Sequence, residues 1–221
     1  MGIDIPKQYI ELNGKPILYY CLKQFENSFI DNIVIVAAKE YIEFCQKEIV
    51  DKFGIKKVSV ICAGGAERYH SVWEGLKAAE ACDYIYIHDG ARPFIDIDSL
   101  YRLKQAVEEN GACVAAMPVK DTIKIVDDDF FAKETPPRKS MWQIQTPQVF
   151  EYGLIREAYR KYIEEDGESL FTATDDAMMV ERLTDKKVKL VEATYNNIKI
   201  TTPEDIEVAR CILDINQKHA I

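Results

Sequence analysis

Short apolar runs rich in β-branched residues alternate with segments of helical periodicity along most of the chain. The runs predict strands at 32–37, 57–62, 84–88, 112–117 and 188–192. The other segments predict helices at 17–27, 41–52, 71–81, 97–109, 152–165, 175–183 and 203–217. Such alternation is typical of an α/β domain, in which right-handed crossovers build a mostly parallel sheet with helices on both faces. We therefore expect a Rossmann-like fold.

The alternation is broken between about 119 and 145. Residues 119–126 alternate with a period of two, three aspartates follow at 127–129, and two prolines precede Arg138. This pattern predicts a β-hairpin arm that leaves the sheet. An isolated arm exposes apolar surface, so we expect a second subunit to cover it. No repeat or linker interrupts the rest, which favours a single domain over 1–221.

Composition narrows the class of protein. The 221 residues are 48% hydrophobic and 29% charged, and the net charge is −9. This is ordinary for a globular protein, and without a long Lys/Arg run it argues against nucleic-acid binding. An acidic enzyme can still bind an anionic nucleotide if a few cations and a divalent metal offset the repulsion.

Two further features concern location. No apolar run approaches the roughly 18 residues of a membrane span, and no signal peptide is recognisable, so a cytoplasmic protein without membrane contact is expected. The six cysteines form no C-x-x-C pair. They are expected to be reduced thiols, several of them buried.

The most informative stretch is the apolar run that ends in His88, Asp89, Gly90, Ala91 and Arg92. Polar groups at the carboxyl end of a buried parallel strand face the crevice where ligands bind in such sheets. Asp89 can hold a divalent metal, Gly90 permits close backbone approach, and Arg92 can grip a phosphate. The alternative is a surface ion pair between Asp89 and Arg92. His88 is expected to be a packed, hydrogen-bonded residue.

A second group follows the strand at 57–62. Gly64 and Gly65 permit close approach of a flat base to the backbone, and Ser71 can donate a hydrogen bond near the start of the next helix. A plain turn between strand and helix remains the alternative.

Two lysines have contexts that point to phosphate chemistry. Lys7 follows Pro6 in a predicted loop and can neutralise charge on a transferring phosphoryl group, although it can also be a solvated surface cation. Lys199 lies between Ile198 and Ile200 in a short predicted strand, so it should point away from the core and toward the crevice. The alternative is a lysine that protects an edge strand.

The remaining candidates are less specific. Thr122 and Arg138 on the arm offer a hydroxyl and a fork for phosphate oxygens. Thr146, in Gln145-Thr146-Pro147-Gln148, is placed to face a ligand. Asp175 and Asp176 resemble a catalytic carboxylate pair, but they are interpreted as an N-cap and a first-turn acid of a helix.

Taken together, these motifs resemble the 2-C-methyl-D-erythritol 4-phosphate cytidylyltransferases of the non-mevalonate isoprenoid pathway. The resemblance covers nearly the whole chain, because eight motifs occur in register. They are Pro6-Lys7-Gln8, the 13–17 segment, Gly64 to Val72, His88 to Pro93, 118–122, 145–148, 174–177 and 197–205. Members of that family use Mg²⁺ to join CTP to a sugar-alcohol phosphate, with release of pyrophosphate. They form dimers through swapped arms.

The resemblance also implies residue roles. Lys7 would steady the triphosphate during in-line attack, Gly64, Gly65, Ser71 and Gly90 would lie by the nucleotide, and Asp89 would engage metal and ribose. Further residues would bind the acceptor and complete catalysis. They are Arg92, Thr146 and Lys199 of the same subunit, and Thr122 and Arg138 of the other.

One part of the family pattern is represented here by Met1 and Gly2 alone. Members begin with a strand and a glycine-rich turn, Ala-Ala-Gly-x-Gly-x-Arg-Met-Gly, whose amides hold the triphosphate. That strand lies in the middle of the sheet, so the sequence as given predicts exposed core, poor CTP binding and slow or absent turnover. An internal methionine chosen as the start of the gene would account for this.

Two alternatives remain open. A ribitol-5-phosphate cytidylyltransferase is compatible with Gly90, although the segments 121–125 and 197–202 favour methylerythritol phosphate. A catalytically impaired or silent nucleotide-binding member is the other.

Overall fold

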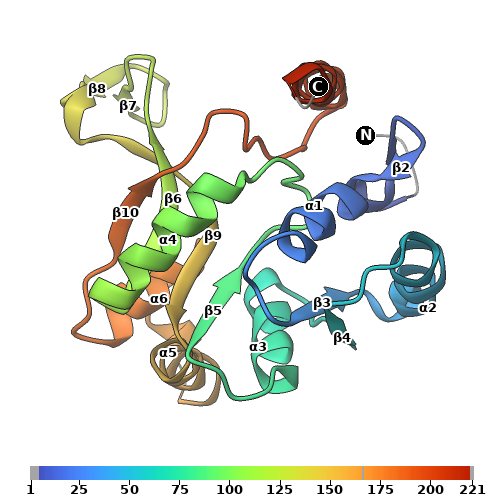
Figure 1. Ribbon diagram of the computed structural model, residues 1–221. Helices are drawn as coiled ribbons and strands as arrows, with labels where there is room; N and C mark the ends of the chain where they lie inside the picture. The colour runs from blue at the N-terminus through green and yellow to red at the C-terminus, as the bar shows by residue number, and fades with distance from the viewer. Residues whose placement is uncertain (1–4, 166, 220–221) are drawn as a thin grey trace.

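The structure, a computed structural model, describes residues 5–165 and 167–219 (Figure 1). Met1 and Gly2, the remnant of the glycine-rich turn, lie outside the described residues. The seven α-helices assigned in these ranges are α1 (Ile17–Glu26), α2 (Ile42–Phe44), α3 (Arg68–Ala78), α4 (Ile97–Asn110), α5 (Tyr152–Glu164), α6 (Asp176–Leu183) and α7 (Pro203–His219). The ten strands are β1 (Glu11–Leu12), β2 (Lys15–Pro16), β3 (Ile33–Ala37), β4 (Val58–Ala63), β5 (Tyr84–Ile87), β6 (Ala112–Pro118), β7 (Ile125–Val126), β8 (Ala132–Glu134), β9 (Trp142–Glu151) and β10 (Lys189–Glu192).

The main sheet has four strands in the order β10-β6-β9-β5. β10 runs parallel to β6, whereas β9 is antiparallel to both β6 and β5. A separate parallel pair is formed by β3 and β4. All five predicted strands are confirmed, and the α/β class with them.

β9 is longer than the sequence indicated. The arm was expected to end at about 145, but the strand that returns from it continues to Glu151. A proline cannot donate to a ladder, so it argues against a central strand. The register between β6 and β9 shifts at this point, from Val114 opposite Gln148 to Ala116 opposite Ile144. This bulge places Pro147 where no ladder hydrogen bond is required of it.

Helices cover both faces of the main sheet. Alternate residues of β6 point to opposite faces, as in any strand. Cys113 and Ala115 pack in one core cluster with Leu103 and Val107 of α4. Ala112 and Val114 pack on the other side with residues of α5 and α6. Figure 1 shows α4 in front of β6 and β9, with α5 and α6 behind them.

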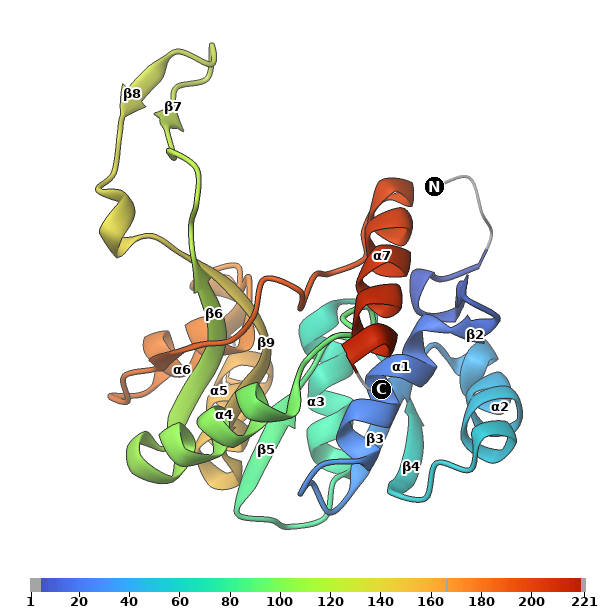
Figure 2. The ribbon, with the colours of Figure 1, turned by 45° about the horizontal axis from the view of Figure 1, so that its top comes forward.

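The amino-terminal half has its own packing. α1 lies against β3 and the π-helical turn Cys45–Asp51, which continues α2. α7 packs on the β1–β2 hairpin and on the segment around Phe94 (Figure 2). In the described residues β3 and β4 do not pair with β5. Within the described ranges no helix is long and apolar enough to cross a bilayer.

The arm is a hairpin in which β7 and β8 pair antiparallel. It projects away from the rest of the subunit (Figure 2). At its tip Phe130 and Phe131 are 86% and 71% exposed. These two side chains form an exposed apolar surface at the tip of the arm.

Candidate active site

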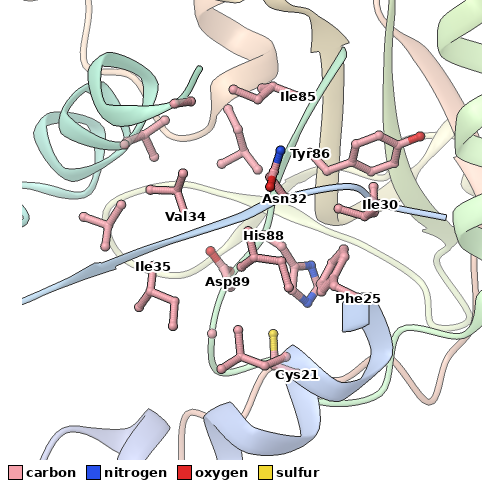
Figure 3. A pocket seen from close by; sticks show the side chains of 18 of the residues that line it. Cys21, Phe25, Ile30, Asn32, Val34, Ile35, Ile85, Tyr86, His88 and Asp89 are labelled. Atoms are coloured by element: carbon pink, nitrogen blue, oxygen red, sulfur yellow. The ribbon is translucent and has the colours of Figure 1, made fainter. Parts of the chain in front are cut away.

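A cavity of about 1060 Å³ lies between β3 and β5, over α1 and α3. Its deeper walls are apolar, with Val34 and Ile35 of β3 on one side and Ile85 and Tyr86 of β5 on the other (Figure 3). The polar residues of its lining include Lys7, Arg68, Ser71, Asp89 and Lys199. The cavity therefore runs along the unpaired edges of β3 and β5, and Arg68, Asp89 and Lys199 form a charged cluster in its lining.

Asp89 is the centre of this charged cluster. Lys199 Nζ lies 2.9 Å from its Oδ2, Arg68 Nε lies 3.4 Å from Oδ1, and Arg92 Nε lies 3.6 Å from Oδ2. The Asp89 and Arg92 side chains are 14% and 13% exposed, so the ion pair named as the alternative is present but largely buried rather than at the surface. The three cations come from three different parts of the chain, and the fold brings them to one carboxylate.

These cations control the protonation state of Asp89. Burial opposes ionisation, but the hydrogen bond from Lys199 and the charges of Arg68 and Lys199 outweigh it, so the pKa of Asp89 is lowered. Burial also lowers the pKa of Arg92, against the attraction of Asp89. The carboxylate is thus ionised with more positive than negative charge around it, and such a site attracts an anionic ligand.

Thr146 and His88 hold the backbone of Asp89. His88 Nε2 lies 2.9 Å from the Arg92 carbonyl, which can only accept, so this nitrogen carries the proton. Nδ1 then accepts from the Thr146 hydroxyl at 3.0 Å, and that hydroxyl accepts from the Asp89 N–H at 3.0 Å. Burial lowers the pKa of His88 to about 4, which keeps the ring neutral. The expectation that His88 is packed and hydrogen-bonded is confirmed.

The segment carrying Lys199 is held against the same loop. Asn197 is fully buried, and its side-chain amide donates to Gln145 Oε1 and to the Thr146 carbonyl. The backbone carbonyl of Asn197 accepts from Arg92 Nη1 at 2.9 Å. The Ile200 N–H donates to the Ala91 carbonyl at 2.9 Å. No strand is assigned at 197–201 in the described chain, so the predicted short strand is wrong. The predicted direction of Lys199 is confirmed, because Ile200 is buried and Lys199 reaches Asp89.

The glycine turn packs tightly on α3. A Cβ on Gly65 would lie 2.4 Å from Cβ of His70, and one on Gly64 would lie 2.7 Å from Ser71 Oγ. The Gly65 N–H donates to Ser71 Oγ at 3.2 Å. The glycines are thus required by the turn itself, while Ser71 also lines the cavity. Gly90 lines the cavity as well, close to Leu18.

The other predicted residues are placed as follows. Lys7 is exposed at the rim of the cavity. Thr146 is buried, and its hydroxyl is bonded within the protein. Arg138 and Thr122 belong to the arm, which extends away from this cavity (Figure 2), and Arg138 donates to the Lys120 carbonyl at 3.0 Å.

One cluster was missed by sequence reasoning. Asp175 caps α6 as expected, accepting from the Met178 N–H at 2.9 Å. Asp176 is not only a first-turn acid of α6. It is fully buried, and its carboxylate accepts hydrogen bonds from both Nη groups of Arg68. Tyr159 also donates its hydroxyl to Asp176. The available signal was the position of Asp176 beside Ala177, Met179 and Val180, the buried side of α6.

The side chains present restrict how a metal can be held. In the described part of the chain no group of three or more His, Cys, Asp or Glu residues is arranged around a metal position. Mg²⁺ is commonly bound by one or two carboxylates together with the phosphates of its ligand. Asp89 fits that arrangement.

A Rossmann-like domain with a cationic cluster at the end of β5 is the architecture of a nucleotidyltransferase. The sequence profile described as IspD, 2-C-methyl-D-erythritol 4-phosphate cytidylyltransferase, matches residues 1–215. The chain belongs to this family.

Individual relatives agree. The 2-C-methyl-D-erythritol 4-phosphate cytidylyltransferase of Lachnospira eligens is 51% identical over 217 residues, which is 96% of this chain and 93% of the relative. That of Alkaliphilus oremlandii is 47% identical, over 96% of this chain and 89% of its own. The crystal structure of 4-diphosphocytidyl-2C-methyl-D-erythritol synthase from Anaerococcus prevotii is 37% identical and superposes with a TM-score of 0.85, covering 95% of this chain and 90% of that one.

Proposed function

We propose that this protein transfers the cytidylyl group of CTP to 2-C-methyl-D-erythritol 4-phosphate and releases pyrophosphate. The family and its relatives support the reaction. The observation that carries it in the structure is the convergence of Lys199, Arg68 and Arg92 on Asp89 at the mouth of the cavity. Both substrates are anions, and this end of the cavity is cationic.

In the proposed mechanism the substrate phosphate attacks the α-phosphorus of CTP in line, and pyrophosphate leaves. Lys7 neutralises charge on the triphosphate, and Lys199 does so at the reacting phosphate. Arg92 binds the acceptor phosphate, while Gly64, Gly65, Ser71 and Gly90 lie by the nucleotide. Thr146 contributes by holding Asp89 and His88 in place. Catalysis is positioning and charge neutralisation, without a covalent enzyme intermediate.

Mg²⁺ is proposed as the metal, held by Asp89 together with triphosphate oxygens. When bound it would neutralise the charge of the triphosphate. Asp89 is ionised, so its carboxylate can supply one ligand to a metal that arrives bound to the triphosphate.

A homodimer is also proposed. Phe130 and Phe131 at the exposed tip of the arm support a subunit contact there. Arg138 and Thr122 would then complete the acceptor site of the other subunit, since the arm carries them away from the cavity of their own (Figure 2).

The decisive experiment measures pyrophosphate release from CTP with each of two acceptors. Turnover with 2-C-methyl-D-erythritol 4-phosphate that needs Mg²⁺ and exceeds turnover with ribitol 5-phosphate supports the proposal. Preference for ribitol 5-phosphate would assign the other acceptor, and binding of CTP without any turnover would leave a silent nucleotide-binding protein.

A further inference from the structure

We propose that Asp176 is a positioning residue of the active site, which acts on Asp89 through the guanidinium of Arg68. The inference rests on the proposed function, because it concerns the same site. It assigns a task to a buried carboxylate that would otherwise be only a first-turn acid of α6.

The contacts form a continuous relay from the core to the cavity. Arg68 Nη1 and Nη2 lie 2.8 and 2.7 Å from the two carboxylate oxygens of Asp176, which is fully buried. The remaining donor edge of the same guanidinium, Nε, lies 3.4 Å from Asp89 Oδ1. The Arg68 side chain is 38% exposed, so it bridges a buried acid and a half-open cavity.

A guanidinium held in this way has little freedom. The planar fork matches a carboxylate in one orientation, so a two-pronged contact sets the plane of the group and the direction of Nε. Because Asp176 is buried, removing its cation would leave an uncompensated charge in the interior, which is strongly unfavourable. The pKa of Arg68 agrees with this, since burial lowers it but the hydrogen bonds and charge of Asp176 raise it above its ordinary value.

Asp176 is itself held from two sides. Tyr159, in the core between α5 and α6, donates its hydroxyl to it. Gln148 of β9 accepts from the Ala177 N–H at 2.8 Å and donates to Asp175 Oδ2 at 3.0 Å, which ties the start of α6 to the sheet. The same strand carries Thr146, which holds the Asp89 backbone. The side chain and the backbone of Asp89 are therefore positioned from one rigid element.

The consequence for the reaction is that Arg68, one of the three cations beside Asp89, is already held in position before the substrates bind. Asp89 is placed by Arg68 where it meets the metal and nucleotide, and loss of an outer partner of a ligating carboxylate typically costs about 10- to 100-fold in activity. A purely structural pair between α3 and α6 would contribute to stability and leave turnover unchanged in protein that folds.

Kinetics separate these cases. Asp176→Asn keeps the shape but removes the charge, and we expect kcat to fall about tenfold or more with a smaller change in KM for CTP. Arg68→Lys keeps the charge but cannot span both carboxylates, and we expect a similar fall. If Asp176 acts through Arg68, the double variant is no worse than Arg68→Lys alone. If the kcat loss of the double variant equals the product of the two single losses, the inference is overturned. Tyr162→Phe is the matched control, because Tyr162 lies in the same helix as Tyr159 and its hydroxyl bonds the Phe171 carbonyl and the Ala173 N–H rather than Asp176, so its kcat should stay within about twofold of wild type.

Absence of turnover in the wild-type protein would refute the proposed function but would not test the role of Asp176. A second measurement, independent of turnover, tests that role. The Arg68 Nε–H signal is measured by ¹H–¹⁵N NMR. Slow hydrogen exchange is expected in the wild type and in Tyr162→Phe, and fast exchange in Asp176→Asn. Unchanged exchange in Asp176→Asn would overturn the relay. If Asp176→Asn does not fold, Arg68→Lys and Tyr162→Phe decide. Wild-type kcat in Arg68→Lys overturns the inference, and a fall in Arg68→Lys with wild-type kcat in Tyr162→Phe supports it.

Discussion

Lys199 Nζ lies 2.9 Å from Oδ2 of Asp89, although the two residues come from distant parts of the sequence. Asp89 ends the strand β5, and Lys199 lies in the segment that leads into α7. The contact joins the two stretches that the sequence marks as most informative. It also closes one end of the cavity between β3 and β5 with a charge pair that a phosphate can reach.

Replacement of Lys199 by methionine should lower kcat about a hundredfold, because a fixed cation at a developing negative charge is typically worth that much. The change also leaves Asp89 with fewer cations. The measurement is steady-state pyrophosphate release. Lys187→Met, at an exposed position remote from the cavity, is the control and should retain wild-type kcat. Equal kcat in both variants would contradict a catalytic role for Lys199.

Thr146→Val should destabilise the protein by about 1 to 3 kcal/mol, because a buried N–H of Asp89 and a ring nitrogen of His88 lose their partner. Chemical denaturation measures the change. Thr146→Ser keeps the hydroxyl and should lose much less. If valine were as stable as threonine, the network around His88 would not contribute to folding.

The free energy of unfolding should depend on pH through His88. Burial lowers the pKa of His88 from 6.5 to about 4, so below pH 6.5 the unfolded chain takes up a proton that the folded protein does not. This contribution is fully present above about pH 6.5 and is lost as the pH falls toward 4, for a total of about 2 to 4 kcal/mol. Denaturation of wild type and His88→Gln at several pH values checks it. The same decline in the variant would show that other groups cause it.

Gly65→Ala should destabilise the protein by about 1 to 3 kcal/mol, because the added Cβ would lie 2.4 Å from Cβ of His70. The turn must then move away from α3, and we expect a raised KM for CTP as well. Gly153→Ala is the matched control, since a Cβ there meets nothing within 4 Å. In α5 that change should be neutral or stabilising. Thermal unfolding of both variants gives the comparison.

The proposed sharing of the arm predicts complementation. Arg138→Ala and Lys199→Met should each be nearly inactive, but in a mixed dimer one of the two sites has both residues intact. Random mixing of the two variants after unfolding and refolding should therefore restore about one quarter of wild-type activity. Recovery of none, with dimers verified by light scattering, would mean that Arg138 and Lys199 serve the same subunit.

Several features of the fold were accessible from periodicity alone. The five predicted strands and the hairpin arm are present, because burial imposes a period of two or of 3.6 on local sequence. The continuation of β9 from 145 to Glu151 was not predicted. A proline argues against a central strand, and the bulge that accommodates Pro147 exists only once β6 is paired. A register shift between two strands has no local signature.

In the site, too, some residues were predictable from the sequence and others were not. Asp89, Arg92 and Lys199 were identified from their places at a strand end or between buried neighbours, and the structure brings them together. Thr146 was assigned to the ligand, but it is buried with its hydroxyl bonded to His88 and Asp89. Asp176 was interpreted as a helix-start acid, and its contact with Arg68 could not be expected.

The sequence by itself determined which elements form, which face of each is apolar and which charged residues stand at strand ends, since these depend on neighbours along the chain. Only the tertiary structure decided which carboxylate each cation meets. Arg68 and Asp176 belong to different helices, and their contact depends on how α3 and α6 pack on the sheet. Pairing across such distances is set by the summed packing of the core, which no local pattern records.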